Sequence, residues 1–309
     1  MADLSVKYLG LPLKNPLIAG SSPLADSIDG ARRLEEAGAA AIVLRSLFEE
    51  QFAAPEAPET AAFSPDAYLA HLAQLKKAVG IPVFASLNGS GRGRWIDQAA
   101  RIEAAGADGL ELNLYLMATD CWEPPQAVER RTEEVVRTVK ALVRIPVAVK
   151  LSAFYTSVPN LVQRLDSAEA DGVVLFNRIS LPDIDLENSG VHPGIPLSDA
   201  AELPLRLHAA AVLFGRIRPS IALSGGVSTS IDALKAVAAG ADAVQMVSAL
   251  IRRGPECLGR VLEGMSSWLD AHGHASVDHL RGKLSLLRCP DPHAWQRGRY
   301  RRVLRDVPV

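Results

Sequence analysis

Short apolar runs alternate along this chain with longer segments of helical periodicity. Four of the runs follow a phrase of small residues, built from Ala and Gly and in two cases ending in Asp-Gly, at 37–41, 105–109, 168–172 and 239–243. Glycine commonly ends a helix because it adopts the left-handed backbone conformation. A short, continuous apolar run is typical of a buried parallel strand. The pattern therefore predicts strands near residues 42, 110, 173 and 244.

Proline introduces the other four apolar runs. It stands at the head of each, within 15–19, 81–85, 145–149 and 218–222. Proline is tolerated at the first residue of a strand, so these runs predict strands near residues 17, 83, 147 and 221. Apolar stripes between the strands predict helices, for example over 72–79, 128–142 and 231–237.

Eight strands alternating with helices predict an α/β fold with a parallel sheet. Eight repeats in about 250 residues favour a closed (β/α)8 TIM barrel, and a doubly wound open sheet is the alternative. Residues 4–13, with Gly10 in the middle, predict an N-terminal hairpin that plugs the barrel floor. We expect a C-terminal helical extension, one long loop over 48–65 and a single domain over 1–309, because no linker interrupts the pattern.

The amino-acid composition limits the kinds of molecule and surface that the protein can bind. Thirty-three Lys and Arg balance thirty-five Asp and Glu, a formal net charge of −2, so no overall field directs the chain to nucleic acid or to a membrane surface. No apolar run approaches the roughly 18 residues of a membrane span. Cys121, Cys257 and Cys289 are too scattered for a disulfide framework or a metal cluster. We expect a cytoplasmic protein without a bound metal.

A barrel places its chemistry where the strands end, because the loops there converge on one mouth. The polar and small residues at the predicted strand ends are Gly20, Arg45, Ser46, Asn88, Asn113, Lys150, Asn177, Arg178, Ser224, Gly225, Gly226, Val247 and Ser248. Amides, hydroxyls and cations around one cavity suit a polar, planar ligand that carries an anionic group.

The segment that starts at Ser224 leads through Gly225 and Gly226 into a predicted helix. Glycines let backbone amides approach an anion, and a helix N-terminus adds positive potential. We therefore predict a phosphate site here, shared with Val247 and Ser248. The structural alternative is that the two glycines make only a tight turn.

Lys150 ends an apolar strand, where an ammonium needs a partner. One interpretation is a cation beside the pyrimidine edge of a flavin. A second is a Schiff-base lysine of a phosphate-binding barrel lyase or isomerase. A third is an internal salt bridge, for instance with Glu111.

Four motifs in order and spacing resemble the dihydroorotate dehydrogenase family: 111–114 (ELNL), 149–152 (VKLS), 175–177 (LFN) and 223–227 (LSGGV). The resemblance implies an FMN-binding barrel, an oxidoreductase of pyrimidine metabolism that acts on a CH–CH group. It places Ala19, Gly20, Ser46 and Asn88 around the flavin, Asn113 and Lys150 on its ring, and Asn177 near flavin and substrate. It assigns the phosphate to Ser224, Gly225, Gly226, Val247 and Ser248.

The chain departs from the family on the substrate side. Leu116 stands where the family has its Cys or Ser base and cannot accept a proton, which argues against dihydroorotate itself as the substrate. Tyr115, Asp120 and Cys121 are the candidate replacements, with Lys150 as the other catalytic group. Arg45 and Arg178 stand where Lys and Ser or Thr are usual, and we assign them to substrate binding together with Asn113 and Asn177.

We expect a small polar, dihydropyrimidine-like substrate. Because no cysteine cluster can hold an iron–sulfur centre, electrons leave through a soluble acceptor or a partner chain. The resemblance also implies a homodimer. A non-catalytic flavin-binding subunit is the remaining alternative.

Overall fold

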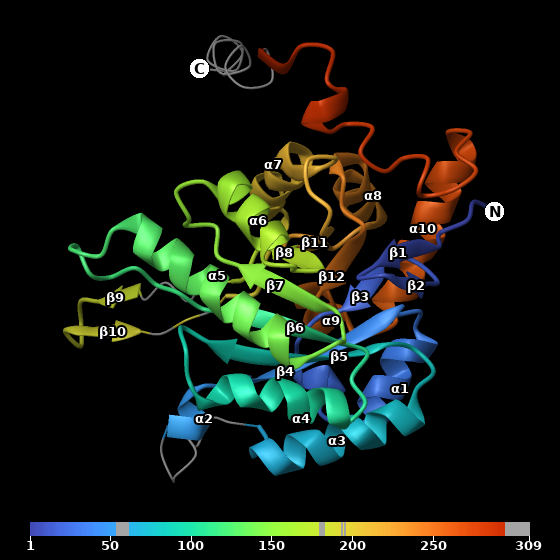
Figure 1. The fold of residues 1–309 in the computed structure, drawn as a ribbon. Helices are drawn as coiled ribbons and strands as arrows, with labels where there is room; N and C mark the ends of the chain where they lie inside the picture. The colour runs from blue at the N-terminus through green and yellow to red at the C-terminus, as the bar shows by residue number, and fades with distance from the viewer. Residues whose placement is uncertain (54–61, 179–182, 193, 195, 294–309) are drawn as a thin grey trace.

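A computed structural model describes residues 1–53, 62–178, 183–192, 194 and 196–293. Its centre is a closed barrel of eight parallel strands (Figure 1). The strands are β3 (Leu17–Ala19), β4 (Ala41–Phe48), β5 (Val83–Gly89), β6 (Gly109–Leu114), β7 (Val147–Leu151), β8 (Gly172–Leu175), β11 (Ser220–Ser224) and β12 (Ala243–Met246). All eight coincide with the predicted runs, so the (β/α)8 barrel is confirmed and the open sheet is excluded.

Helices surround the barrel and include all three predicted stripes. They are α1 (Ile28–Glu36), α3 (Pro65–Ala78), α4 (Gln98–Ala104), α5 (Pro125–Leu142), α6 (Val158–Ser167), α7 (Leu203–Leu213), α8 (Ser230–Ala239), α9 (Ser248–Arg253) and α10 (Cys257–Ala271). Short 3-10 turns are η1 (Pro23–Ala25), η2 (Arg94–Asp97), η3 (Ala200–Glu202) and η4 (Leu286–Arg288). In the described chain, α10 and η4 form the helical C-terminal part.

The segment expected as one long loop begins with a short helix, α2 (Glu50–Ala53). Residues 54–61 of that segment lie outside the described part. Among the described helices, none is both long and apolar enough to cross a bilayer.

Aspartates in three of the four small-residue phrases fasten neighbouring strands to one another. The carboxylate of Asp171, just before β8, accepts the backbone N–H of Val147 at 2.8 Å and the ammonium of Lys140 at 2.6 Å. Asp108 and Asp242 accept the N–H of Val83 and Ile221 in the same way. In three of its four copies the phrase thus marks a helix end and also supplies an acceptor for an amide at the start of the preceding barrel strand.

The predicted plug is a two-stranded hairpin, β1 (Val6–Tyr8) and β2 (Leu11–Leu13). The Tyr8 ring packs edge-on against Phe84 of β5, with centroids 6.0 Å apart. The Leu9 N–H donates to the Ser220 hydroxyl at 3.1 Å. Gly10 turns the hairpin with φ of +80°. The hairpin therefore closes the barrel floor, as predicted.

A second contact at the floor joins the two ends of the described chain. The Asp3 amide donates to the Ala275 carbonyl at 2.9 Å, and the Val277 amide donates to the Asp3 carbonyl at 2.8 Å. This pairing lies beyond α10, so the N-terminal segment is held by residues 275–277.

Replacing Asp171 with Ala tests the aspartate fastening. The substitution leaves the Val147 amide without its acceptor, and we expect the free energy of unfolding to fall by about 1–3 kcal/mol in urea denaturation. Glu36→Ala removes an exposed carboxylate and should change it by about 0.5 kcal/mol or less. Equal losses in both variants would refute the proposed role of Asp171.

Candidate active site

Lys150 lies buried inside the barrel, near its carboxyl end, in a closed ring of polar contacts. Its ammonium donates to Glu111 Oε1 at 3.1 Å and to Gln245 Oε1 at 3.2 Å. The Gln245 amide nitrogen donates to the other oxygen of the Glu111 carboxylate. All three side chains are less than a tenth exposed. The salt bridge with Glu111, one of the three sequence interpretations of Lys150, is therefore present in the structure.

Three asparagines stand at the carboxyl ends of β5, β6 and β8. Asn88 on β5 is in register with Asn113 on β6, and Asn113 is in register with Lys150 on β7. Asn177, just after β8, donates from its side-chain nitrogen to Asn113 Oδ1 at 2.7 Å. All three are half-buried. The structure therefore brings these predicted residues together at one mouth.

The loop after β11 has the backbone shape that its two glycines predict. Gly225 and Gly226 have φ of +96° and +80°. A Cβ on Gly225 would lie 2.7 Å from Arg206 Nη2, and one on Gly226 would lie 2.7 Å from the Leu203 backbone nitrogen. Only glycine fits this loop, which follows the buried Ser224.

The N-terminus of α8 contributes less than the sequence suggested. Thr229 and Asp232 form a capping box, and the Asp232 carboxylate accepts the backbone N–H of both Ser228 and Thr229. A carboxylate therefore already occupies the positive end of this helix. An anion at this loop would depend on the glycine amides more than on the helix.

Two residues at this loop were missed by sequence reasoning. The buried Ser198 accepts the Gly226 N–H at 3.3 Å and donates through its hydroxyl to Ser248 Oγ at 2.9 Å. Arg206 donates from Nε to the Ser224 carbonyl and from Nη1 to the Glu202 carbonyl at 2.8 Å. Arg206 lies on the buried, mostly apolar face of α7. A cation among apolar helix positions is the sequence signal that could have identified it.

Residues at the ends of β3 and β4 lie in close contact with residues of the neighbouring strands and loops. A Cβ on Gly20 would lie 2.6 Å from Val247 Cγ2, and Ala19 is buried beside it. The Ser46 and Ser86 hydroxyls are 2.8 Å apart.

Both predicted substrate-binding arginines have carboxylate partners. Arg45 binds the Asp26 carboxylate through Nε at 3.1 Å and Nη2 at 2.6 Å. Arg178 Nη2 lies 3.3 Å from Glu202 Oε1. Its buried Nη1 has no hydrogen-bond partner in the described part of the chain. Arg178 therefore retains a donor for a ligand.

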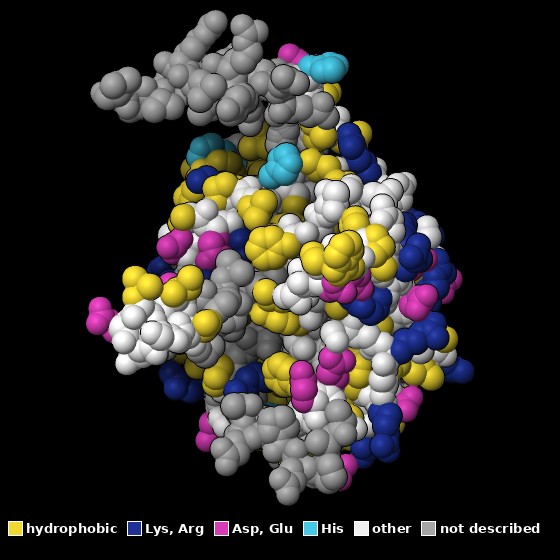
Figure 2. Space-filling model, turned by 90° about the vertical axis from the view of Figure 1, so that its left-hand side faces the viewer, with side chains coloured by type: hydrophobic (Ala, Val, Ile, Leu, Met, Phe, Trp, Pro, Cys, Tyr) yellow, Lys and Arg dark blue, Asp and Glu magenta, His cyan; other side chains and the backbone are white. Residues whose placement is uncertain are grey.

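The loop after β6 carries the candidate bases. Tyr115 and Leu116 are half-buried, whereas Asp120 and Cys121 are exposed. Exposed apolar side chains continue over this loop, the loop after β7 and the hairpin of β9 (Asp183–Asp185) and β10 (Gly190–His192): Met117, Trp122, Phe154, Ile184, Leu186 and Val191. Figure 2 shows apolar side chains spread over this face of the molecule. A polar mouth is thus bordered by an apolar rim.

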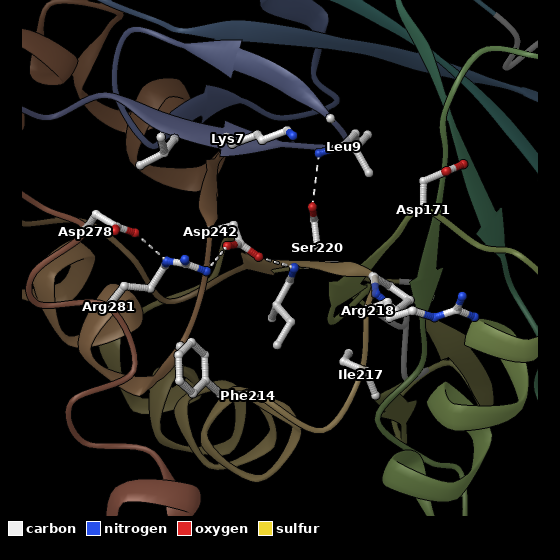
Figure 3. Close-up of a pocket in the computed structure, with 16 residues that line it drawn as sticks. Lys7, Leu9, Asp171, Phe214, Ile217, Arg218, Ser220, Asp242, Asp278 and Arg281 are labelled. Carbon is white, nitrogen blue, oxygen red and sulfur yellow. Dashed lines mark hydrogen bonds and ion pairs between the residues drawn. The ribbon is translucent and has the colours of Figure 1, made fainter.

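A cavity of about 600 Å³ lies at the opposite end of the barrel, under the hairpin plug (Figure 3). Arg281 bridges Asp242 and Asp278 in its wall, at 2.7 and 2.8 Å. Burial raises the pKa of Asp242, and the Ile221 amide and Arg281 oppose this rise. None of the predicted site residues lines this cavity. Its aspartates and arginines are paired within the chain, as in a structural ion-pair network.

Comparison with known proteins decides the family. A family model described as dihydroorotate dehydrogenase matches residues 64–269, two thirds of the chain. The chain belongs to the dihydroorotate dehydrogenase family. The resemblance of the four motifs is thereby confirmed.

The relatives are distant, and two of the three described below cover about nine tenths of this chain. A chain of Aeropyrum pernix assigned to dihydroorotate dehydrogenase A (fumarate) is 28% identical over 306 residues, 91% of this chain and 97% of its own. The catalytic subunit of a dihydroorotate dehydrogenase B (NAD(+)) of Pyrococcus furiosus is 25% identical, covering 91% and 98%. The corresponding subunit of Thermoplasma acidophilum is 26% identical, covering 60% and 66%.

Dihydroorotate dehydrogenase family members are FMN-binding flavoenzymes, and the donors at the mouth fit that cofactor. An ammonium has three N–H groups, and Lys150 uses two of them on Glu111 and Gln245. One N–H is therefore left for a ligand. Gly225 and Gly226 lack the side chains that would block an approach to their backbone. FMN, predicted from the resemblance, is confirmed for the family, whereas the role of each residue stays a prediction.

Gly226→Ala tests the shape of the glycine loop, with Gly10→Ala as a matched control. Both glycines have φ of +80°, but nothing lies within 4 Å of a Cβ on Gly10. We expect Gly10→Ala to lower the free energy of unfolding by about 1 kcal/mol through backbone strain alone. Gly226→Ala should cost more, because the Leu203 backbone must also move. Equal losses in thermal unfolding would show that the loop has room for a side chain.

Proposed function

We propose that this chain is an FMN-dependent oxidoreductase that transfers a hydride between flavin and a carbon of a small polar substrate of the dihydropyrimidine type. The observation that carries the proposal is the convergence of Asn113, Lys150 and Asn177 on three neighbouring strand ends, in a chain of this family. A cation flanked by two amides suits a planar heterocycle with alternating donors and acceptors.

The site residues divide by chemistry into three groups. When bound, FMN supplies the hydride acceptor. Lys150 would hold the ring through its free N–H and stabilise negative charge that develops there. Ser224, Gly225, Gly226, Val247 and Ser248 would hold the phosphate, and the hydroxyl of Ser198 lies among them. Ala19, Gly20, Ser46 and Asn88 would border the ring.

The substrate side favours an anionic substrate. Arg178 follows Asn177 directly, and its buried Nη1 has no acceptor in the described part of the chain. A carboxylate is the natural partner of such a guanidinium. The proton-transfer role belongs to the loop after β6, where Tyr115 is half-buried and Cys121 is exposed. The half-buried Tyr115 is the better placed of the two.

The electron acceptor is a soluble molecule or a partner chain. The relatives' names specify fumarate in one case and NAD(+) with a catalytic subunit in others. A homodimer in the cytoplasm remains our prediction, and the apolar rim around the mouth supports an interface there.

Two alternatives have less support. A lyase or isomerase would form a covalent bond between Lys150 and the substrate. The Lys150 side chain would then have to give up its hydrogen bonds to Glu111 and Gln245. A non-catalytic flavin-binding subunit is favoured by the loss of the usual base at Leu116. Family membership favours the oxidoreductase over both.

Purification tests the cofactor. We expect the protein to be yellow, and mass spectrometry of the released cofactor should identify FMN. Anaerobic addition of dihydropyrimidine carboxylates other than dihydroorotate should bleach the flavin spectrum. A colourless protein that also fails to bind added FMN would overturn the proposal.

Leu116→Cys tests the missing base. A thiol placed where the family carries its base should raise the rate of flavin reduction by dihydroorotate by about 100-fold, the lower end of general base catalysis. Met117→Cys puts a thiol one position further along the same loop and should leave the rate near that of the unmodified protein. Stopped-flow absorbance under anaerobic conditions measures both. Equal rates in the two variants would show that residue 116 is not the position of the base.

A further inference from the structure

We infer that Gln245 and Glu111 are positioning residues that hold the Lys150 ammonium in one place in the mouth and leave a single N–H for the flavin. The inference deepens the proposed function and rests on it. Neither Gln245 nor Glu111 is among the residues assigned to the cofactor above.

The contacts form a closed ring in which each side chain bonds to the other two. Lys150 donates to both partners, Glu111 accepts from both, and Gln245 accepts at Oε1 and donates at Nε2. The oxygen of the Gln245 amide therefore accepts a hydrogen bond, whereas its nitrogen donates one. A leucine of similar size could perform neither of them.

Burial makes the ring costly to open. Lys150, Glu111 and Gln245 are 6%, 3% and 1% exposed. An ammonium in such surroundings needs both a counter-charge and hydrogen bonds to its remaining protons. Glu111 supplies the counter-charge, and Gln245 supplies a neutral acceptor that fixes the direction of a second N–H. The direction of the third N–H then follows from the tetrahedral ammonium.

The ring joins parts of the barrel that are far apart in the sequence. Glu111 and Lys150 come from the adjacent strands β6 and β7, whereas Gln245 comes from β12, which pairs with β11 and β3. Three strands thus determine the position of one nitrogen atom.

Gly20 provides the space that Gln245 needs. The backbone N–H of Gly20 donates to the Met246 carbonyl at 3.0 Å. A Cβ there would lie 3.3 Å from Gln245 Cβ and 3.6 Å from Gln245 Oε1. A side chain at residue 20 would therefore press on the glutamine that orients Lys150.

Gln245→Leu tests the inference, with Gln98→Leu as the matched control. Gln98 is also a buried glutamine, but it lies on α4 and bonds to Arg101. We expect Gln245→Leu to weaken FMN binding to the apoprotein about tenfold, since a hydrogen bond to a charged group is lost. The midpoint potential of the bound flavin should become more negative, because the cation near its reduced ring is less well placed. Gln98→Leu should change neither quantity. Flavin fluorescence quenching and redox titration measure them.

A second comparison, made in a variant that lacks the Lys150 ammonium, shows whether Gln245 acts through Lys150. In the charge-neutral double variant Glu111→Gln/Lys150→Met, adding Gln245→Leu should change FMN affinity less than twofold. If Gln245→Leu is insoluble, Gln245→Asn, which withdraws the amide by one methylene, gives the same comparison.

The outcomes separate the two proposals. Wild-type protein that does not bind FMN overturns the proposed function and the inference together. Wild-type protein that binds FMN, with Gln245→Leu unchanged in affinity and potential, overturns the inference alone. A tenfold loss that persists in the double-variant background also overturns it, because Gln245 would then act without Lys150.

Discussion

Closure of the barrel by the pairing of β12 with β3 is the constraint on which the site depends. Val244, Gln245 and Met246 pair with Leu17, Ile18 and Ala19, so the last strand completes a circle with the first. Only a closed sheet turns the side chains of β6, β7 and β12 toward a common interior. In an open sheet, Gln245 and Lys150 would lie at different positions along a surface. The position of the Lys150 ammonium between Glu111 and Gln245 is thus a consequence of barrel closure.

Sequence alone predicted the fold because its signals are local. Proline before four strands and the Ala-Gly phrase before the other four act over a few residues, and the structure follows both. It also predicted which strand ends would meet, since parallel strands of a barrel share one mouth. It could not choose among three interpretations of Lys150, because Gln245 comes from the far side of the barrel. Ser198 was missed because it lies in a connection without periodicity.

The two halves of the mouth differ in how far they keep the family pattern. The side that we assign to the cofactor has an asparagine at the end of β6, a lysine at the end of β7 and paired glycines after β11. The side that we assign to the substrate has Leu116 at the position where the motif resemblance places a base, and arginines at 45 and 178. Strands carry the asparagine and the lysine of the first set, and loops carry Leu116 and Arg178 of the second, so the second set can vary without disturbing the barrel.

The pairing of Asp3 with residues 275–277 affects how the chain folds during synthesis. Asp3 is synthesised before all eight barrel strands, whereas the residues that pair with it, 275–277, are synthesised after α10. Closing so long a loop has an entropic cost that local contacts do not share. The N-terminal segment therefore has no such partner until residues 275–277 have been synthesised. This contact can form only after all eight barrel strands have left the ribosome, and it fastens the N-terminal segment to the residues beyond α10.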